Sequence, residues 1–141
     1  MKVVILSFTQ AGTRLGERIG SQFRNEGITC QNYAPAGYAF ADVLPFPENP
    51  KELIREGWGG ETSFLFIGAV GIAVRYIAPY VKDKFTDSAV VVMDEKSGYV
   101  IPLLSGHLGG VRWNFPISLQ YGPVQFRYRQ QRLMFRGGNL Q

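Results

Sequence analysis

One short apolar run constrains the fold of this chain more than any other feature. Within residues 63–67, apolar side chains occupy both odd and even positions, and the run ends at Gly68. Because side chains alternate between the two faces of a strand, such a run is typical of a parallel strand buried on both faces. Parallel strands are joined by crossovers, usually helices, so the run predicts an α/β protein.

The segments around this run alternate between strand and helix patterns. Strands are expected at residues 2–8, 28–33, 63–67, 89–93 and 98–104, and helices at 12–27, 50–57 and 71–78. In the first helix, Leu15, Ile19 and Phe23 recur at the spacing of one helical face, and Gly27 provides a glycine stop. The proline-rich residues 34–50 are expected to form an irregular connection. This order predicts an open, mostly parallel sheet flanked by helices, a Rossmann-like three-layer fold.

The positive charge of the chain comes from its last part alone. The 141 residues carry a net charge of +4, but residues 111–141 hold five arginines and no acidic residue, which leaves residues 1–110 at −1. No run of about 18 apolar residues occurs, and the start lacks a secretory pattern. A soluble, cytoplasmic protein with no membrane partner is therefore expected.

A protein-held metal ion is not expected. Cys30 and His107 are the only cysteine and the only histidine, and they stand 77 positions apart. This spacing matches no zinc pattern. Residues 29 and 31 supply no charge that would activate the thiol, so Cys30 is interpreted as a small, half-buried residue.

Two glycine-rich junctions between a strand and a helix are the candidate binding elements, at residues 68–71 and 105–110. In a parallel sheet such junctions lie at the carboxyl edge, where glycines let backbone N–H groups approach an anion. The alternative is that the glycines only make tight turns. His107 lies in the second junction and can carry a proton near neutral pH, or its ring can simply satisfy a neighbouring backbone group.

Charged residues lie close to both junctions. Arg75 is one turn into the helix after the first junction, where a guanidinium can hold a carboxylate through two parallel bonds. Its alternative role is a surface ion pair. Asp94 and Glu95 follow the strand at 89–93, either as a base or as parts of a solvated turn.

The chain resembles the N-terminal part of the cobalamin-biosynthesis protein CbiG over residues 1–110. The stretches that carry the resemblance are residues 68–79, 82–84, 87, 89–95 and 100–110, which include Gly68-Ala69-Val70-Gly71 and Ser105-Gly106-His107-Leu108-Gly109-Gly110. The resemblance implies a cobalt-precorrin-5A hydrolase of the anaerobic vitamin B12 route. Such an enzyme opens a δ-lactone on a cobalt-corrinoid substrate, releases acetaldehyde and gives cobalt-precorrin-5B. It implies no cofactor, because the substrate carries the cobalt.

This resemblance leads to a hypothesis for the site. His107, with Ser105 beside it, activates water, and backbone N–H groups near Gly106 and Gly109 polarise the lactone carbonyl. The substrate carboxylates are expected to be bound by the glycine junctions and one arginine: Gly68, Gly71, Arg75, Gly106, Gly109 and Gly110. The alternative is a non-catalytic module that binds an anionic tetrapyrrole or a nucleotide.

The sequence departs from this family after Gly110. We back-translated residues 111–141 and shifted the reading frame so that each new codon starts at the third base of an old one. This shifted frame can encode Ala-x-Glu-Leu at its start. Further on it permits Pro-Val-Ser-Thr-Thr-Ala-Thr-Asp, at the spacing of the Pro-Val-Ile-Thr-Thr-Ala-Thr-Asp expected in the family. We therefore expect a family-like α/β domain at 1–110 and a frameshifted tail at 111–141. The α/β fold is then truncated at its C-terminal end, and self-association through the exposed core is expected.

The alternative for the tail is natural divergence. An arginine-rich tail with interleaved aromatic residues would then be a candidate for binding nucleic acid. A frameshifted tail was never selected for this purpose, so no nucleic-acid partner is expected.

Overall fold

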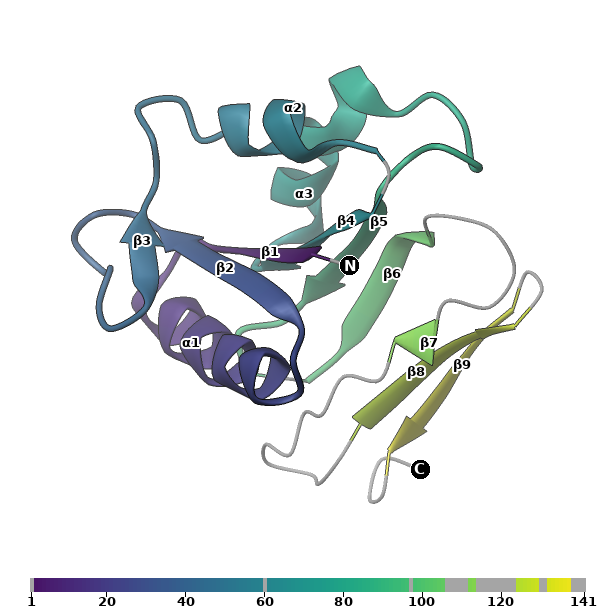
Figure 1. The fold of residues 1–141 in the computed structure, drawn as a ribbon, viewed down its shortest axis with the longest axis horizontal. Coiled ribbons are helices and arrows are strands. Elements are labelled where there is room, and N and C mark those ends of the chain that lie inside the picture. The colour runs from purple at the N-terminus through teal and green to yellow at the C-terminus, as the bar shows by residue number, and fades with distance from the viewer. Residues whose placement is uncertain are drawn as a thin grey trace.

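The computed structural model describes residues 2–59, 61–96, 98–105, 112–113, 124–129 and 132–137. Within these ranges the chain forms a six-stranded sheet covered by helices and a separate three-stranded sheet (Figure 1). The main sheet has the order β3-β2-β1-β4-β5-β6, and every pair except β5–β6 is parallel. The predicted mostly parallel, Rossmann-like α/β fold is confirmed.

The main sheet consists of β1 (Lys2–Ser7), β2 (Thr29–Ala34), β3 (Val43–Pro45), β4 (Thr62–Ile67), β5 (Ala89–Met93) and β6 (Val100–Ser105). Its helices are α1 (Gln10–Asn25), α2 (Glu52–Gly57) and α3 (Val70–Ile77), followed by the 3-10 turn η1 (Ala78–Tyr80). The second sheet is antiparallel and consists of β7 (Arg112–Trp113), β8 (Val124–Arg129) and β9 (Arg132–Gly137).

The helices cover the main sheet from both sides. α1 lies against one face, and α2 and α3 lie against the other (Figure 1). On the α1 side, Leu15, Ile19 and Phe23 pack against the sheet, as their spacing predicts. On the other side, Ile54 and Ile77 belong to a second buried cluster. The strand at Thr62–Ile67 is buried on both faces, because each of these clusters takes alternate side chains from it.

The last strand of the main sheet runs against the others. In the β5–β6 register, Met93 lies opposite Val100 and Ala89 lies opposite Ser105. The connection between the two strands is only residues 94–99, which is too short for the crossover that parallel strands need. β6 therefore ends, at Ser105, at the amino edge of the parallel strands.

The proline-rich segment 34–50 is also more ordered than predicted. It contains β3, a three-residue strand that pairs with β2 at the edge of the sheet. An edge strand tolerates Pro45, because one side of its backbone has no strand to donate to.

Both ends of α1 have capping contacts. The helix begins at Gln10, two residues before the predicted opening at residue 12, because the Thr9 hydroxyl accepts a hydrogen bond from the Gly12 N–H at 3.0 Å. At the other end, the Ile28 N–H donates to the Phe23 carbonyl at 2.9 Å, and Gly27 adopts a φ of 80°. This left-handed glycine confirms the predicted stop.

α1 approaches β2 closely over a buried asparagine. Asn32 is 2% exposed, and its Nδ2 donates to the Gly16 carbonyl at 2.6 Å. Its Oδ1 accepts from Arg24 Nη1 at 3.2 Å. A Cβ atom added at Gly20 would lie 2.3 Å from the same Oδ1, so only glycine fits there.

Cys30 is buried on β2, 8% exposed, and its burial raises the pKa of the thiol from 9.0 to about 11. At pH 9 an ordinary thiol is about half ionised, whereas this one is about 1% ionised. We expect iodoacetamide to label folded protein at pH 9 roughly 50-fold more slowly than urea-unfolded protein. Equal labelling rates would show that the thiol is accessible.

The same shift gives a pH dependence of stability. Because the thiol ionises first in the unfolded chain, the free energy of unfolding should fall as the pH rises from 9 towards 11. A Cys30→Ala variant lacks the titrating thiol, so its free energy of unfolding should fall less between pH 8 and pH 10.5. Urea titrations of both proteins at these two pH values measure the difference.

Candidate functional site

The first glycine junction lies at the carboxyl edge of the parallel strands, as predicted. Gly68 follows β4, and its N–H donates to the Met93 carbonyl at the end of β5, at 2.9 Å. No side chain caps the α3 helix that begins at Val70. Gly71 is exposed, and a Cβ atom added there would meet no other atom within 4 Å. Gly71, in the first turn of α3, therefore faces open space at this edge.

A set of hydroxyl and carboxylate groups lies at the same edge. The Thr9 hydroxyl, after β1, donates to Glu95 Oε2, after β5, at 2.5 Å. Ser7 Oγ donates to Thr13 Oγ1 at 3.2 Å, and Thr13 Oγ1 donates to the Thr9 carbonyl at 2.7 Å. Sequence reasoning missed Thr9, although a threonine directly before an amphipathic helical segment is a recognisable capping signal.

The two acidic residues after β5 have different roles. Asp94 Oδ2 accepts from the Gly98 N–H at 3.3 Å and so closes the β5–β6 turn, as its alternative interpretation expects. Glu95 instead reaches across to Thr9. Each carboxylate thus has a hydrogen-bond partner within the described residues.

Arg75 is exposed on α3 and makes no ion pair within the described part of the chain. Its guanidinium is therefore accessible to an external carboxylate. Next to it, Tyr76 packs on the aromatic ring of Phe8, with ring centroids 5.6 Å apart, and Lys51 Nζ lies 5.6 Å from the Tyr76 ring centroid. The Tyr76 packing fixes this side of α3 against the sheet.

The prediction that both glycine junctions share one edge is wrong for Ser105, the residue at which the second junction begins. Ser105 pairs with Ala89 at the start of β5, whereas Gly68 lies beside Met93 at its end. A strand of this length separates its two ends by roughly 13 Å at about 3.3 Å per residue. Gly106, His107, Gly109 and Gly110 lie outside the described residues, so their predicted roles stay predictions.

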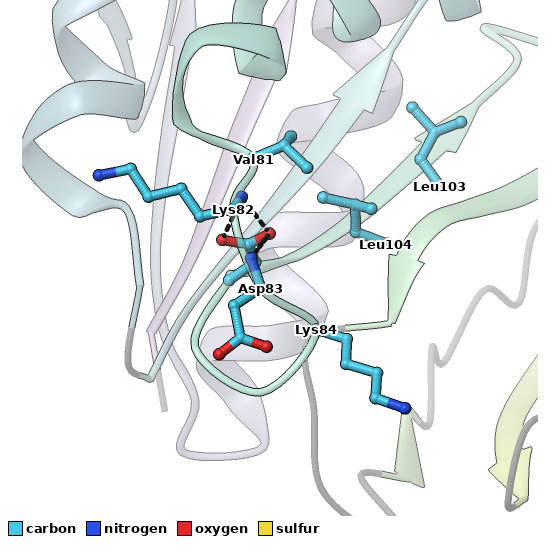
Figure 2. A pocket seen from close by; sticks show the side chains of 7 residues that line it. Val81, Lys82, Asp83, Lys84, Leu103 and Leu104 are labelled. Carbon is cyan, nitrogen blue, oxygen red and sulfur yellow. Dashed lines mark hydrogen bonds between the residues drawn. The ribbon is translucent and has the colours of Figure 1, made fainter.

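A cavity of about 310 Å³ lies at the amino edge, on the side where β6 ends. Figure 2 shows the side chains around it. They come from the loop before β5 and from β6: Val81, Lys82, Asp83, Lys84, Asp87, Leu103 and Leu104. Residues 82–84 and 87 contribute to the family resemblance, but nothing in their sequence pattern predicts this cavity.

Asp87 binds the backbone of the loop that lines the cavity. Its carboxylate is 7% exposed and accepts from Trp58 Nε1 at 3.2 Å. It also accepts from the backbone N–H of Lys82, at 2.9 Å, and of Asp83, at 3.1 Å. Because three donors converge on one buried carboxylate, the loop is folded around Asp87, which is a structural group rather than a free base.

The walls of the cavity differ in character. Val81, Leu103 and Leu104 form an apolar side, and the side chains of Lys82 and Lys84 extend away from it in opposite directions (Figure 2). Neither lysine forms an ion pair within the described ranges. The cavity therefore has an apolar wall, and the two exposed ammonium groups point out of it (Figure 2).

The described ranges contain no group of three or more His, Cys, Asp or Glu side chains that can hold a metal ion. They also contain no helix of the length and apolarity that a membrane crossing requires.

The fold and strand order define a Rossmann-like α/β protein. The strand order changes direction at β1, because β2 and β3 lie on one side of it and β4, β5 and β6 on the other. Residues 52–113 match the family described as cobalamin synthesis G N-terminal, and this part of the chain belongs to that family. The match includes the first glycine junction, the cavity and the end of β6.

Two curated relatives are named cobalt-precorrin-5A hydrolase. The one from Salmonella typhimurium is 38% identical over 108 residues, and the one from Priestia megaterium is 31% identical over 107 residues. These alignments cover 77% and 75% of this chain. The chain spans 29% of the length of each relative.

A solved structure supports the same relationship. A putative cobalamin biosynthesis protein G homolog from Sulfolobus solfataricus matches with a TM-score of 0.57 and 26% identity. The match covers 82% of this chain and 31% of the other.

Proposed function

We propose that this chain supplies the N-terminal part of a cobalt-precorrin-5A hydrolase and contributes to binding its cobalt-corrinoid substrate. The observation that carries the proposal is the 38% identity to a curated enzyme of that name over 108 residues. The exposed Arg75, Lys82 and Lys84 supply cations for a ring that bears acetate and propionate groups. The cobalt belongs to the substrate, and the proposed setting is the cytoplasm.

The proposed reaction opens a δ-lactone by attack of water and releases acetaldehyde. The candidates for activating water are His107 and Ser105, and backbone N–H groups at Gly106 and Gly109 are the candidates for polarising the carbonyl. Gly68, Gly71 and Arg75 lie at or near the other edge of the sheet and are proposed only as contacts to substrate carboxylates. Gly110 is proposed as one more such contact.

Acetaldehyde release from cobalt-precorrin-5A tests this function. The chain is compared with an extended protein in which the third-base reading frame replaces residues 111–141 and continues to its own stop codon, so that the rest of the relatives' length is included. We expect the extended protein to release acetaldehyde and its His107→Ala variant to lose most of this activity, typically 10²-fold or more for a general base. Absence of release from an extended protein that unfolds cooperatively would contradict the proposal.

The tail is proposed to be an out-of-frame translation. Its support is the family match, which stops at residue 113, and the absence of acidic residues from 111–141. Sequencing the coding DNA from codon 100 onward tests it. A third-base frame that continues into Thr-Thr-Ala-Thr-Asp supports the frameshift, and immediate stop codons in that frame exclude it. In the second case the arginine-rich tail would be tested for salt-dependent nucleic-acid binding.

A further inference from the structure

We infer that β6 and the amino-edge cavity beside it form the surface on which the remaining part of a cobalt-precorrin-5A hydrolase polypeptide packs. The identity of this partner rests on the proposed function, but the apolar character of the surface does not. The partner is the part of the relatives that follows the aligned region, since the chain spans 29% of each relative and the matched family is described as N-terminal. The surface is therefore assigned to packing within the enzyme and not to its substrate.

β6 is less buried than the strand beside it. All five residues of β5 are buried, whereas residues 100–104 of β6 are only half-buried. Val100 packs against the cluster on the α1 side, and Leu103 and Leu104 pack against the cluster on the α2 and α3 side, so neither face of β6 is fully covered. Among the described strands, β6 pairs with β5 alone and lies at the end of its sheet. An element that covers these side chains gains hydrophobic free energy.

The cavity extends this apolar surface towards the amino edge. Its volume is about 310 Å³, and Val81, Leu103 and Leu104 form its apolar wall (Figure 2). Val81 is 43% exposed although it is aliphatic, and the aromatic ring of Phe85 on the same loop is 54% exposed. Single exposed apolar side chains are common on protein surfaces, but a group of them around one hollow marks an interaction surface.

The charges around the cavity do not enter it. The side chains of Lys82 and Lys84 leave it in opposite directions (Figure 2). The Asp87 carboxylate accepts hydrogen bonds from the indole N–H of Trp58 and from two backbone N–H groups. An apolar side chain can therefore enter the cavity without displacing these hydrogen bonds or burying an ammonium group, whereas a charged ligand would meet an apolar wall.

The place of the cavity in the fold favours a partner that follows β6 in the relatives. β6 ends at Ser105, next to Leu104 of the cavity wall, and the family match continues to residue 113. Consecutive elements of a chain are usually neighbours in space. The polypeptide that follows β6 in family members therefore starts beside this surface. The other edge strand, β3, also carries an exposed leucine, Leu44, but lies at the opposite end of the sheet.

Binding between two separate polypeptides tests this inference without the enzymatic reaction. The full chain is mixed with the part of the Salmonella typhimurium relative that follows its aligned region, and biolayer interferometry measures the dissociation constant. We expect binding, and we expect Val81→Asp and Leu104→Asp each to weaken it roughly tenfold or more, because each places a carboxylate in an apolar contact. Val81 is exposed in the free chain, so Val81→Asp should retain its thermal midpoint and tests the surface even if Leu104→Asp loses stability.

Leu44→Asp is the matched control. Leu44 lies on an edge strand and is 48% exposed, which is close to the exposure of Val81, but it belongs to the opposite edge of the sheet. Its replacement should change the dissociation constant by less than about twofold. Equal weakening by Leu44→Asp and Val81→Asp would overturn the inference, because the partner would then respond to added charge at any place.

The remaining outcomes also decide the inference. Absence of binding to the folded, unsubstituted chain at about 100 μM would overturn it. So would a dimer of the chain alone, seen by sedimentation velocity, that Val81→Asp dissociates, because a second copy would then occupy the surface. If both variants lose the partner but the extended protein releases no acetaldehyde, the docking surface stands and the proposed hydrolase function fails. If the extended protein releases acetaldehyde while both variants bind the partner as tightly as the unsubstituted chain, the function stands and the docking surface fails.

Discussion

Replacing Gly20 with alanine is expected to lower the free energy of unfolding by roughly 1–3 kcal/mol, the cost of overpacking a closely packed site. The new Cβ atom would lie 2.3 Å from Asn32 Oδ1 and 3.0 Å from its Cγ. Asn32 cannot move away freely, because it donates to the Gly16 carbonyl and accepts from Arg24. Urea unfolding followed by circular dichroism measures the change.

Gly71→Ala is the matched control for this prediction. Gly71 also lies in a helix, but no atom lies within 4 Å of an added Cβ. Alanine should therefore stabilise α3 by about 0.5–1 kcal/mol through its higher helix propensity. If both variants shifted stability by the same amount, helix propensity and not the approach of α1 to Asn32 would explain the result.

Replacing Asp87 with asparagine is expected to cost roughly 2–3 kcal/mol, because a buried charged acceptor is lost and its donors lose partners. The amide keeps one oxygen for the Lys82 and Asp83 N–H groups, while its own N–H₂ faces the remaining donor. The loop before β5 should loosen, and the fluorescence of Trp58 should change with it. Thermal and urea unfolding give the magnitude.

Asp83→Asn is the control on the same loop. Asp83 is exposed, and among the described residues its carboxylate accepts from one backbone N–H, that of Phe85. The expected change is within about 0.5 kcal/mol, as for most surface substitutions. A loss at Asp83 as large as that at Asp87 would mean that loop charge, and not the buried hydrogen bonds, stabilises the segment.

Much of the fold could be predicted from local patterns. The spacing of Leu15, Ile19 and Phe23 identified the buried face of α1, and Gly27 identified its end, because both signals depend only on neighbouring residues. The buried strand before Gly68 was equally clear. The edge strand β3 was missed, since three residues that end at a proline carry almost no strand signal.

The candidate site was harder to predict, because it depends on strand direction. The glycine motifs at Gly68 and after Ser105 look alike in sequence, and both were assigned to one edge. The length of the connection at residues 94–99 contained the missing information, since it cannot carry the chain back to form a parallel strand. The role of Asp87 depends on Trp58, 29 positions earlier, and no local pattern shows such a contact.

The direction of β6 also has a consequence for how the chain folds. Met93 and Val100 are seven residues apart, so the β5–β6 hairpin closes a short loop and is expected to form within microseconds. β1 and β4 join partners sixty residues apart, such as Lys2 and Thr62. Loop closure over that distance costs more entropy. The β1–β4 pair at the centre of the sheet is therefore expected to form after the β5–β6 hairpin.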